Sequence, residues 1–241
     1  MISTLLNILL LAFIFLSIIG VGDFIYAKLK LILFPNELIP NLIIRFGIGL
    51  SLLVILLMIF GFFGLLYSSI AWLVLITFFL FILVGQYRNN LSLFQQNLSF
   101  PKLKKFEIVC LSIIIVNSLL YLYTSLSPTL DGDSLANYLL LPREYVLNKS
   151  IVVVDYAIGS VYPQNGQLLN TFGLLINGQI LAQLFTSWMM GLVCILTIYS
   201  IGKFLFNRKA ALLGVIIWYS TYSVAFIAQS PKIDLAWAAL E

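Results

Sequence analysis

The chain has 241 residues, of which 62% are hydrophobic and 9% are charged, and its mean hydropathy is +1.09. A soluble globular domain carries roughly 25% charged residues, so the composition excludes a soluble protein and predicts an all-α polytopic membrane protein. The formal net charge is +4, but the lysines and arginines stand between apolar runs and form no basic face for nucleic acid. The absence of histidine excludes histidine-based acid–base catalysis, histidine-ligated metal and a Ser-His-Asp triad.

Six apolar runs are long enough, or nearly so, to cross a bilayer. We expect these spans at residues 2–21, 42–66, 69–84, 106–123, 180–201 and 210–228. A signal peptide is the alternative for the first run, but that run lacks a basic leading segment and a clear cleavage site. The connector 23–41 and the polar loop 85–105 separate the early runs, and the loop has room for a short interfacial helix.

A long polar loop, residues 124–178, follows the fourth span. Within it, the apolar piece 166–175 is too short to span alone, so it is a re-entrant helix, an interfacial helix or the first half of the next element. A basic turn at 202–209 separates the fifth and sixth spans. Residues 235–241 have the composition of a seventh helix that is cut off, so we expect the chain to be a fragment of a longer protein.

The positive charges orient the spans, because cytoplasmic loops carry an excess of lysine and arginine. Placing the loops 23–41, 85–105 and 202–209 in the cytoplasm puts ten positive residues on or next to that side: Lys28, Lys30, Arg45, Arg88, Lys102, Lys104, Lys105, Lys203, Arg208 and Lys209. Only Arg143, Lys149 and Lys232 then fall on the other side. The loop 124–178 is therefore predicted to face outward, where no nucleotide pool exists and an activated donor must come from the lipid.

Asp131 and Asp133 stand two residues apart at the start of this outer loop. In an extended or turn conformation their side chains would point the same way. The two carboxylates could then share one divalent cation, or one could act as a general base while the other tunes its pKa. The alternative is structural: Asp131 belongs to a turn and Asp133 caps a helix that begins at Ser134.

Other residues of the outer side could contact a substrate. Tyr138 falls at helical spacing in a segment that Pro142 interrupts or restarts as a second short helix. Arg143 could reach a phosphate, or it could contact a headgroup or pair with Glu144 or Asp155. The remaining candidates are the amides of a turn, Gln164 and Asn165, and the ionisable residues after the sixth span, Lys232 and Asp234. A plain turn and a snorkelling lysine are their structural alternatives.

The stretch Asp131-Gly-Asp133-Ser-Leu-Ala-Asn-Tyr138-Leu-Leu-Leu-Pro142-Arg143, placed after a membrane span, resembles the first outer loop of bacterial GT-C glycosyltransferases. These enzymes use polyprenyl-phosphate sugars and include relatives of protein mannosyltransferases and of the aminoarabinose transferase of lipid A. Further matching pieces occur in order: Tyr162-Pro-Gln-Asn-Gly166-Gln-Leu-Leu, Ala182-Gln-Leu-Phe, Gly202-Lys-Phe-Leu-Phe-Asn-Arg208-Lys-Ala-Ala-Leu-Leu-Gly214 and Gln229-Ser-Pro-Lys-Ile-Asp234-Leu-Ala.

This resemblance covers roughly residues 106–241 and implies a truncated GT-C-like core, preceded by a three-span region at 1–105. It implies that an aspartate of the first outer loop is the catalytic carboxylate, and Asp131 and Asp133 both remain open because a glycine separates them here. It also implies that Asp234 matches an acidic position that opens a later core helix. The membrane would be the bacterial inner membrane, and the cofactor, if any, a divalent cation held by Asp131 and Asp133.

We therefore expect a membrane glycosyltransferase, or part of one, that moves a sugar from a polyprenyl-phosphate carrier to an extracytoplasmic glycan, lipid or protein. The alternative from another class is a non-catalytic membrane subunit that binds polyprenyl lipid or assembles an envelope glycoconjugate complex. A small-molecule transporter fits less well, because it would place charges or broken helices at mid-bilayer.

Overall fold

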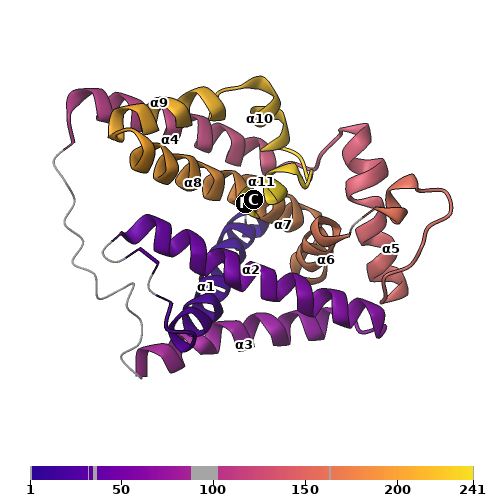
Figure 1. The fold of residues 1–241 in the computed structure, drawn as a ribbon. Coiled ribbons are helices and arrows are strands. Elements are labelled where there is room, and N and C mark those ends of the chain that lie inside the picture. The colour runs from indigo at the N-terminus through magenta and orange to yellow at the C-terminus, as the bar shows by residue number, and fades with distance from the viewer. Residues whose placement is uncertain (1, 32, 35–36, 88–102, 163, 241) are drawn as a thin grey trace.

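The computed structural model describes residues 2–31, 33–34, 37–87, 103–162 and 164–240, and every regular element in these ranges is helical (Figure 1). Four helices are long and apolar enough to cross a membrane: Ser3–Lys28, Leu38–Phe62, Lys105–Ser125 and Gln179–Leu205. They correspond to the first, second, fourth and fifth expected spans. The described chain is therefore a helical protein of multi-pass membrane character.

The helices form two groups. In the first group, α1 (Ile2–Lys28) packs against both α2 (Leu38–Phe62) and α3 (Ser68–Tyr87). α1 crosses α2 at backbone distance: a Cβ atom on Gly49 would lie 2.0 Å from the carbonyl oxygen of Ile18, so this approach requires glycine. α3 occupies the third expected span, but its apolar part with described side chains, Ser68–Leu83, is shorter than a full span.

α1 continues beyond the expected end at residue 21 and through the first part of the expected connector. Asp23 lies inside the helix, and its Oδ1 atom is 2.7 Å from Nη1 of Arg45 on α2, with 3% of each side chain exposed. An opposite charge beside each group makes the burial of both tolerable. The sequence-based expectation that Asp23 begins a connector was therefore wrong.

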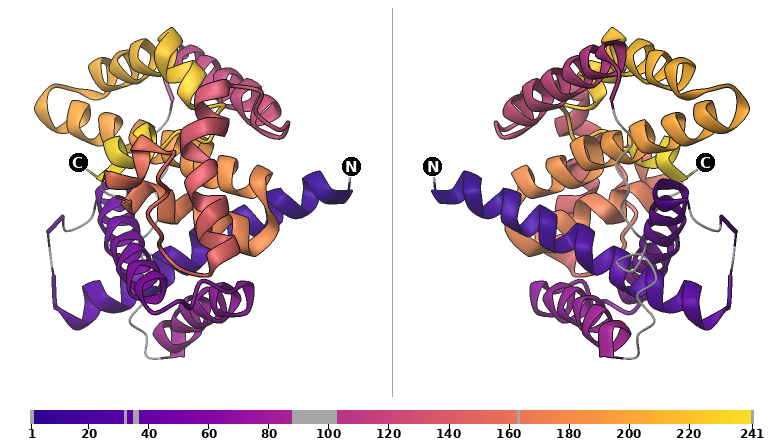
Figure 2. Two further views of the ribbon diagram at one scale, coloured as in Figure 1. Left: turned by 90° about the vertical axis from the view of Figure 1, so that its right-hand side faces the viewer. Right: turned by 90° about the vertical axis from the view of Figure 1, so that its left-hand side faces the viewer.

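The second group of helices contains α4 (Lys105–Ser125), α7 (Gln179–Gln183), η3 (Leu184–Met189), α8 (Met190–Leu205), α9 (Arg208–Tyr219), α10 (Tyr222–Ile227) and α11 (Asp234–Leu240). α7, η3 and α8 form one continuous helical run, in which η3 is a π-helical segment. Figure 2 shows α4 and α9 on one side of the molecule and α2 and α3 on the opposite side, with α6 and α8 between them. α11 is the helix expected at 235–241, and the structure describes it as far as Leu240.

The sixth expected span, 210–228, is not one helix. α9 ends at Tyr219 and α10 begins at Tyr222, so neither piece is long enough to cross a membrane. The break coincides with Ser220 and Thr221, whose hydroxyl groups compete with the backbone for helical hydrogen bonds. Thr221 Oγ1 donates to the carbonyl of Ile217 at 2.7 Å, one turn back.

The loop 124–178, which we predicted to face outward, contains η1 (Ser134–Tyr138, π-helical), α5 (Leu140–Asn148), η2 (Ile158–Val161) and α6 (Asn165–Asn177). α6 is the expected short apolar piece, and most of its side chains are buried against α5, α7 and α2. Gly178, at φ +90°, turns the chain from α6 into α7, so α6 is not the first half of the next element. Pro142 lies in the first turn of α5, where a proline is tolerated.

The basic loops meet at one end of the molecule. Lys203 Nζ lies 2.8 Å from Glu37 Oε2, and Arg208 Nε lies 3.1 Å from Glu107 Oε1 in the first turn of α4. These contacts place the described ends of the loops 23–41, 85–105 and 202–209 together, as the charge distribution predicted. Most of the loop 85–105 lies outside the described residues, including the expected interfacial helix and two of the counted charges, Arg88 and Lys102.

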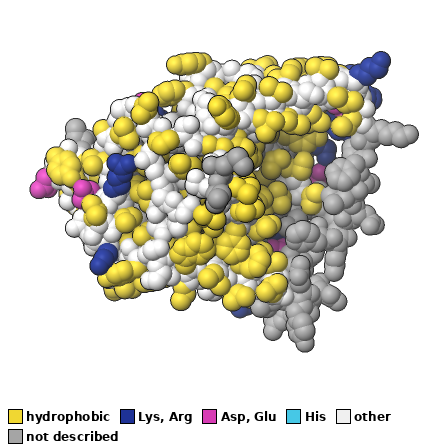
Figure 3. Space-filling view, turned by 180° about the vertical axis from the view of Figure 1, so that it is seen from behind, with side chains coloured by type: hydrophobic (Ala, Val, Ile, Leu, Met, Phe, Trp, Pro, Cys, Tyr) yellow, Lys and Arg dark blue, Asp and Glu magenta, His cyan; other side chains and the backbone are white. Residues whose placement is uncertain are grey.

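The loop 124–178 lies at the opposite end, where the backbone N–H of Leu66 in the α2–α3 turn donates to the carbonyl of Lys149 at 2.9 Å. Between the two ends the surface is apolar (Figure 3). α3 and α4 alone expose eleven large aliphatic side chains: Leu73, Ile76, Leu80, Leu83, Ile108, Val109, Ile113, Ile115, Val116, Leu119 and Leu120. Apolar surface of this extent suits contact with lipid rather than with water.

Candidate functional site

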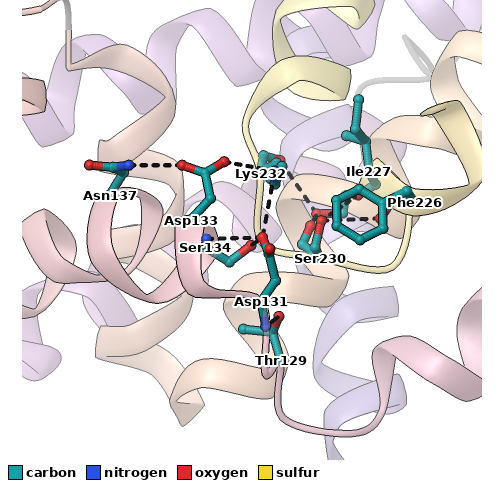
Figure 4. A network of polar contacts seen from close by, with 10 residues as sticks. Thr129, Asp131, Asp133, Ser134, Asn137, Phe226, Ile227, Ser230 and Lys232 are labelled. Carbon is teal, nitrogen blue, oxygen red and sulfur yellow. Dashed lines mark hydrogen bonds and ion pairs between the residues drawn. The ribbon is translucent and has the colours of Figure 1, made fainter.

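The two aspartates of the outer loop meet a lysine that stands 99 residues after Asp133 in the chain (Figure 4). Lys232 Nζ is 2.7 Å from Asp133 Oδ2 and 3.5 Å from Asp131 Oδ2. The side chain of Lys232 is 14% exposed, that of Asp131 is 23% exposed and that of Asp133 is 45% exposed. We call these three residues the carboxylate–lysine cluster, and its graded exposure leaves Asp133 the most open to a ligand.

Local structure places Asp131 at the start of a helical turn. Its Oδ2 atom accepts hydrogen bonds from the backbone N–H of Ser134 at 3.0 Å and from the Ser134 hydroxyl at 2.6 Å. This is the capping geometry that orphan N–H groups at a helix start require. The expectation that Asp133 caps the helix was wrong, because Asp133 itself has helical dihedrals (φ −65°, ψ −42°) and makes no capping hydrogen bond.

Asp133 is held by two donors on opposite sides. Asn137, one turn further along, donates from Nδ2 to Asp133 Oδ1 at 2.8 Å, while Lys232 binds Oδ2. Two aromatic rings flank the ammonium group: Lys232 Nζ lies 5.0 Å from the ring centroid of Phe226 and 5.9 Å from that of Tyr138. Such cation–π contacts favour the charged form of the lysine and restrict where it can move.

The contacts shift the protonation equilibria of all three members. The hydrogen bond from the Ser134 hydroxyl is the largest influence on Asp131 and holds its pKa below the ordinary value, with Lys232 adding to the effect. The hydrogen bond from Lys232 does the same for the pKa of Asp133. Burial alone would lower the pKa of Lys232, but the neighbouring carboxylates outweigh it and raise that pKa. The cluster is thus two carboxylates and one ammonium at neutral pH.

The sequence suggested that Asp131 and Asp133 could share a divalent cation, but the arrangement of the side chains does not fit such a cation. A lysine ammonium already occupies the position between Asp131 and Asp133 that a shared cation would take. In the described ranges, no group of three or more Asp, Glu, Cys or His side chains is placed to hold a metal ion. The positive charge beside the two carboxylates is therefore supplied by Lys232.

Tyr138 and Asp234 lie close to the cluster, and Asp234 follows Lys232 by two residues. Burial is the main cause that raises the pKa of Tyr138, and the negative charge of Asp234 adds to it. Asp234 is exposed in the first turn of α11, where its charge favours the helix dipole. The structure thus brings together Asp131, Asp133, Tyr138 and Lys232, with Asp234 at the edge.

Three other candidates lie apart from the cluster. Arg143 Nη2 donates to Gln179 Oε1 at 2.9 Å, and within the described ranges it has no ion pair with Glu144 or Asp155. Gln164 Nε2 donates to the carbonyl of Gly159 at 2.9 Å and so stabilises its own turn. Asn165, at the start of α6, lines a cavity of about 530 Å³ between α2, α6 and α11. Pro163, from the same expected turn, lies outside the described residues.

Sequence reasoning missed the buried amides behind the cluster. Asn170 on α6 and Gln183 on α7 are 0% exposed. A polar amide inside a membrane protein is costly unless it has partners, so it usually marks a specific contact. The sequence shows the two amides, but it does not show which carbonyl groups they bind.

The chain was also compared with known proteins. No protein-family model, curated protein or solved structure matches it. The resemblance to GT-C glycosyltransferases therefore rests on the motifs quoted above.

Proposed function

We propose that this chain is a membrane glycosyltransferase, or part of one, and that the carboxylate–lysine cluster is its active site. The reaction would move a sugar from a polyprenyl-phosphate carrier to a hydroxyl group of an extracytoplasmic glycan, lipid or protein. The observation that carries this proposal is the pairing of two carboxylates with one lysine at the end of the molecule opposite the basic loops. Such a transfer needs one group to accept a proton and another to neutralise a departing phosphate.

Asp133 is our candidate for the general base. It is more exposed than Asp131, and one of its oxygens faces the ammonium group of Lys232 rather than a backbone donor. Asp131 is committed to the two donors of Ser134, which fixes the loop. The proposed division of roles is that Asp133 takes the proton of the acceptor hydroxyl and Asp131 holds the turn.

Lys232 is our candidate for the group that binds the phosphate of the donor. While it pairs with Asp133, it lowers the pKa of that carboxylate and makes it a weak base. A phosphate that draws the ammonium group away would raise the pKa of Asp133 and strengthen it as a base. Proton abstraction would then be favoured only when the donor is bound.

The site would face the outer side of a bacterial inner membrane, since the basic loops at the other end fit the cytoplasmic side. A lipid donor reaches such a site from within the bilayer. The cavity of about 530 Å³ beside Gly166 and Trp237 is lined largely by apolar groups of α2, α6 and α11, and its size suits part of an apolar chain. Arg143 would contact the acceptor or a lipid headgroup.

The test is transfer from a panel of radiolabelled polyprenyl-phosphate sugars by the purified full-length protein in lipid vesicles. We expect transfer by the wild type, loss of it in Asp133→Asn, and a smaller loss in Asp131→Asn. Wild-type protein that is folded but transfers from no donor, or transfer that is indifferent to both substitutions, would refute the proposal. In that case, retained binding of the lipid would favour the non-catalytic membrane subunit.

A further inference from the structure

Lys232 stands at the end of an irregular segment, residues 229–232, between α10 and α11. Three consecutive carbonyl groups of this segment accept hydrogen bonds from buried side chains of α6, α7 and η3. Gln183 donates to Gln229 at 2.7 Å, Ser187 donates to Ser230, and Asn170 donates to Pro231 at 3.0 Å; the first and third of these donors are side-chain amides. Irregular backbone is tolerated inside a membrane protein only where its polar groups have such partners.

The same two amides also reach the segment that carries the aspartates. Asn170 Nδ2 lies 3.2 Å from the carbonyl oxygen of Tyr138, and Gln183 Nε2 lies 3.4 Å from that of Ser127. These two carbonyl groups stand on either side of Asp131 and Asp133 in the chain. We call residues 127–138 the aspartate segment and residues 229–232 the lysine segment. Each amide therefore joins one carbonyl of the aspartate segment to one carbonyl of the lysine segment.

We propose that Asn170 and Gln183 are positioning residues, whose amide groups hold the aspartate segment and the lysine segment in the register that brings Lys232 onto Asp131 and Asp133. The consequence for catalysis rests on the proposed function, whereas the positioning itself does not. Lys232 reaches the two carboxylates across a distance of 99 residues in the chain, and the contacts of these amides tie the two segments together from behind. Sequence proximity alone could not set this register.

The chemistry of the amide suits the task. A side-chain NH₂ group has two hydrogen atoms and can serve two carbonyl groups at once, whereas a hydroxyl has one. The Thr186 hydroxyl lies 2.9 Å from Asn170 Oδ1, and a donor at that oxygen orients the NH₂ group toward Tyr138 and Pro231. Asn170, Gln183 and Thr186 are all 0% exposed, so water does not replace these bonds.

The experiment measures the reactivity of Lys232, which does not depend on turnover. The full-length protein is treated with limiting acetic anhydride from about pH 7 to about pH 10, and acylation of Lys232 relative to exposed Lys149 is read by peptide mass spectrometry. The variants are Asn170→Leu and Gln183→Met, which keep similar volume without the donors. The matched control is Thr171→Val, an equally buried neighbour whose hydroxyl donates to the Gln167 carbonyl of its own helix at 2.8 Å.

We expect the Lys232-to-Lys149 ratio to rise roughly threefold to tenfold in each amide variant, because loss of the contacts with the two carboxylates lowers the pKa of Lys232 and frees its amine. Thr171→Val should match the wild type. Unchanged ratios in both amide variants, with cooperative thermal unfolding intact, would overturn the positioning role. If Asn170→Leu does not fold, Thr186→Val replaces it, with a smaller rise expected and an unchanged ratio counting against the proposal.

The outcomes for positioning and for function are separable. A raised Lys232 ratio in a protein whose wild type transfers no sugar would support positioning and refute the glycosyltransferase. With an active wild type, the amide variants should lose transfer. The alkaline limb of the remaining pH profile should move to lower pH, because Lys232 gives up its proton more easily once the carboxylates no longer contact it. Full transfer in Asn170→Leu together with an unchanged Lys232 ratio would refute positioning and leave the glycosyltransferase standing.

Discussion

Replacing Lys232 by methionine removes two ion pairs and leaves two carboxylates beside each other. The N···O distances are 2.7 and 3.5 Å, but 45% of the Asp133 side chain and 23% of the Asp131 side chain are exposed, so solvent screens both pairs. Partly exposed pairs contribute about 0.2–1 kcal/mol each. With the added repulsion of the aspartates, we expect Lys232→Met to lower the free energy of unfolding by roughly 1–2 kcal/mol at neutral pH.

The sign of the pH dependence follows from the pKa directions. The pKa values of Asp131 and Asp133 are lowered in the folded protein, so their contribution is present above about pH 4 and is lost as the pH falls through the folded values. The pKa of Lys232 is raised, so its contribution is present below about pH 10 and is lost as the pH rises through the folded value. The difference in the free energy of unfolding between the wild type and Lys232→Met should therefore become smaller at both low and high pH.

The assay is thermal unfolding in detergent from about pH 3 to about pH 11. A deficit of roughly 2–8 °C at neutral pH is expected, taking about 2–4 °C per kcal/mol for a chain of this size. Lys203→Met is the matched control, since its ion pair with Glu37 is about half exposed and is single. A loss of stability that stays constant across the whole pH range, or one no larger than that of Lys203→Met, would show that the ion pairs of Lys232 do not stabilise the fold.

Three further predictions concern the frame around the site. Asp23→Asn should cost about 3–5 kcal/mol, because it leaves a guanidinium that is 3% exposed without its carboxylate; denaturation in detergent measures this, and a loss below about 1 kcal/mol would contradict it. Gly166→Ala should cost roughly 1–3 kcal/mol and loosen the segment of Lys232, since its Cβ would lie 2.7 Å from the Ile233 side chain; an unchanged melting temperature would count against this. In right-side-out vesicles, an impermeant thiol reagent should label Leu130→Cys and not Phe206→Cys, two exposed positions at opposite ends; the reverse pattern would invert the proposed orientation.

The arrangement of the loops was largely predictable, because it depends on composition. Basic residues identified the loops that meet at one end, and the contacts of Lys203 with Glu37 and of Arg208 with Glu107 confirm that these loops lie together. The predicted helix boundaries were wrong where a charged residue finds a partner on another helix and can therefore stay inside its own helix. Asp23 was taken to end a span, but Arg45 from the next helix allows it to stay inside.

The candidate site was predictable only in part. Asp131, Asp133 and Lys232 could each be selected as charged residues of the outer side, but their contact depends on the path of α6–η3 and on two buried amides. Gln164 was selected for its amide, yet it bonds to its own turn, which its neighbours in sequence could have indicated. The break in the helix after Tyr219 was not predicted. The span was predicted from the hydropathy of residues 210–228, which does not reflect how the hydroxyl groups of Ser220 and Thr221 compete for backbone hydrogen bonds.

The catalytic role of the carboxylate–lysine cluster can be tested by single-turnover transfer from a radiolabelled polyprenyl-phosphate sugar, with wild type, Lys232→Met and Lys203→Met in matched vesicles. We expect Lys232→Met to lose transfer by roughly 100-fold or more, because the departing phosphate loses its counter-charge. Lys203→Met, at the other end of the molecule, should transfer at the wild-type rate. Transfer that survives in Lys232→Met, or falls equally in both variants, would contradict a catalytic carboxylate–lysine cluster.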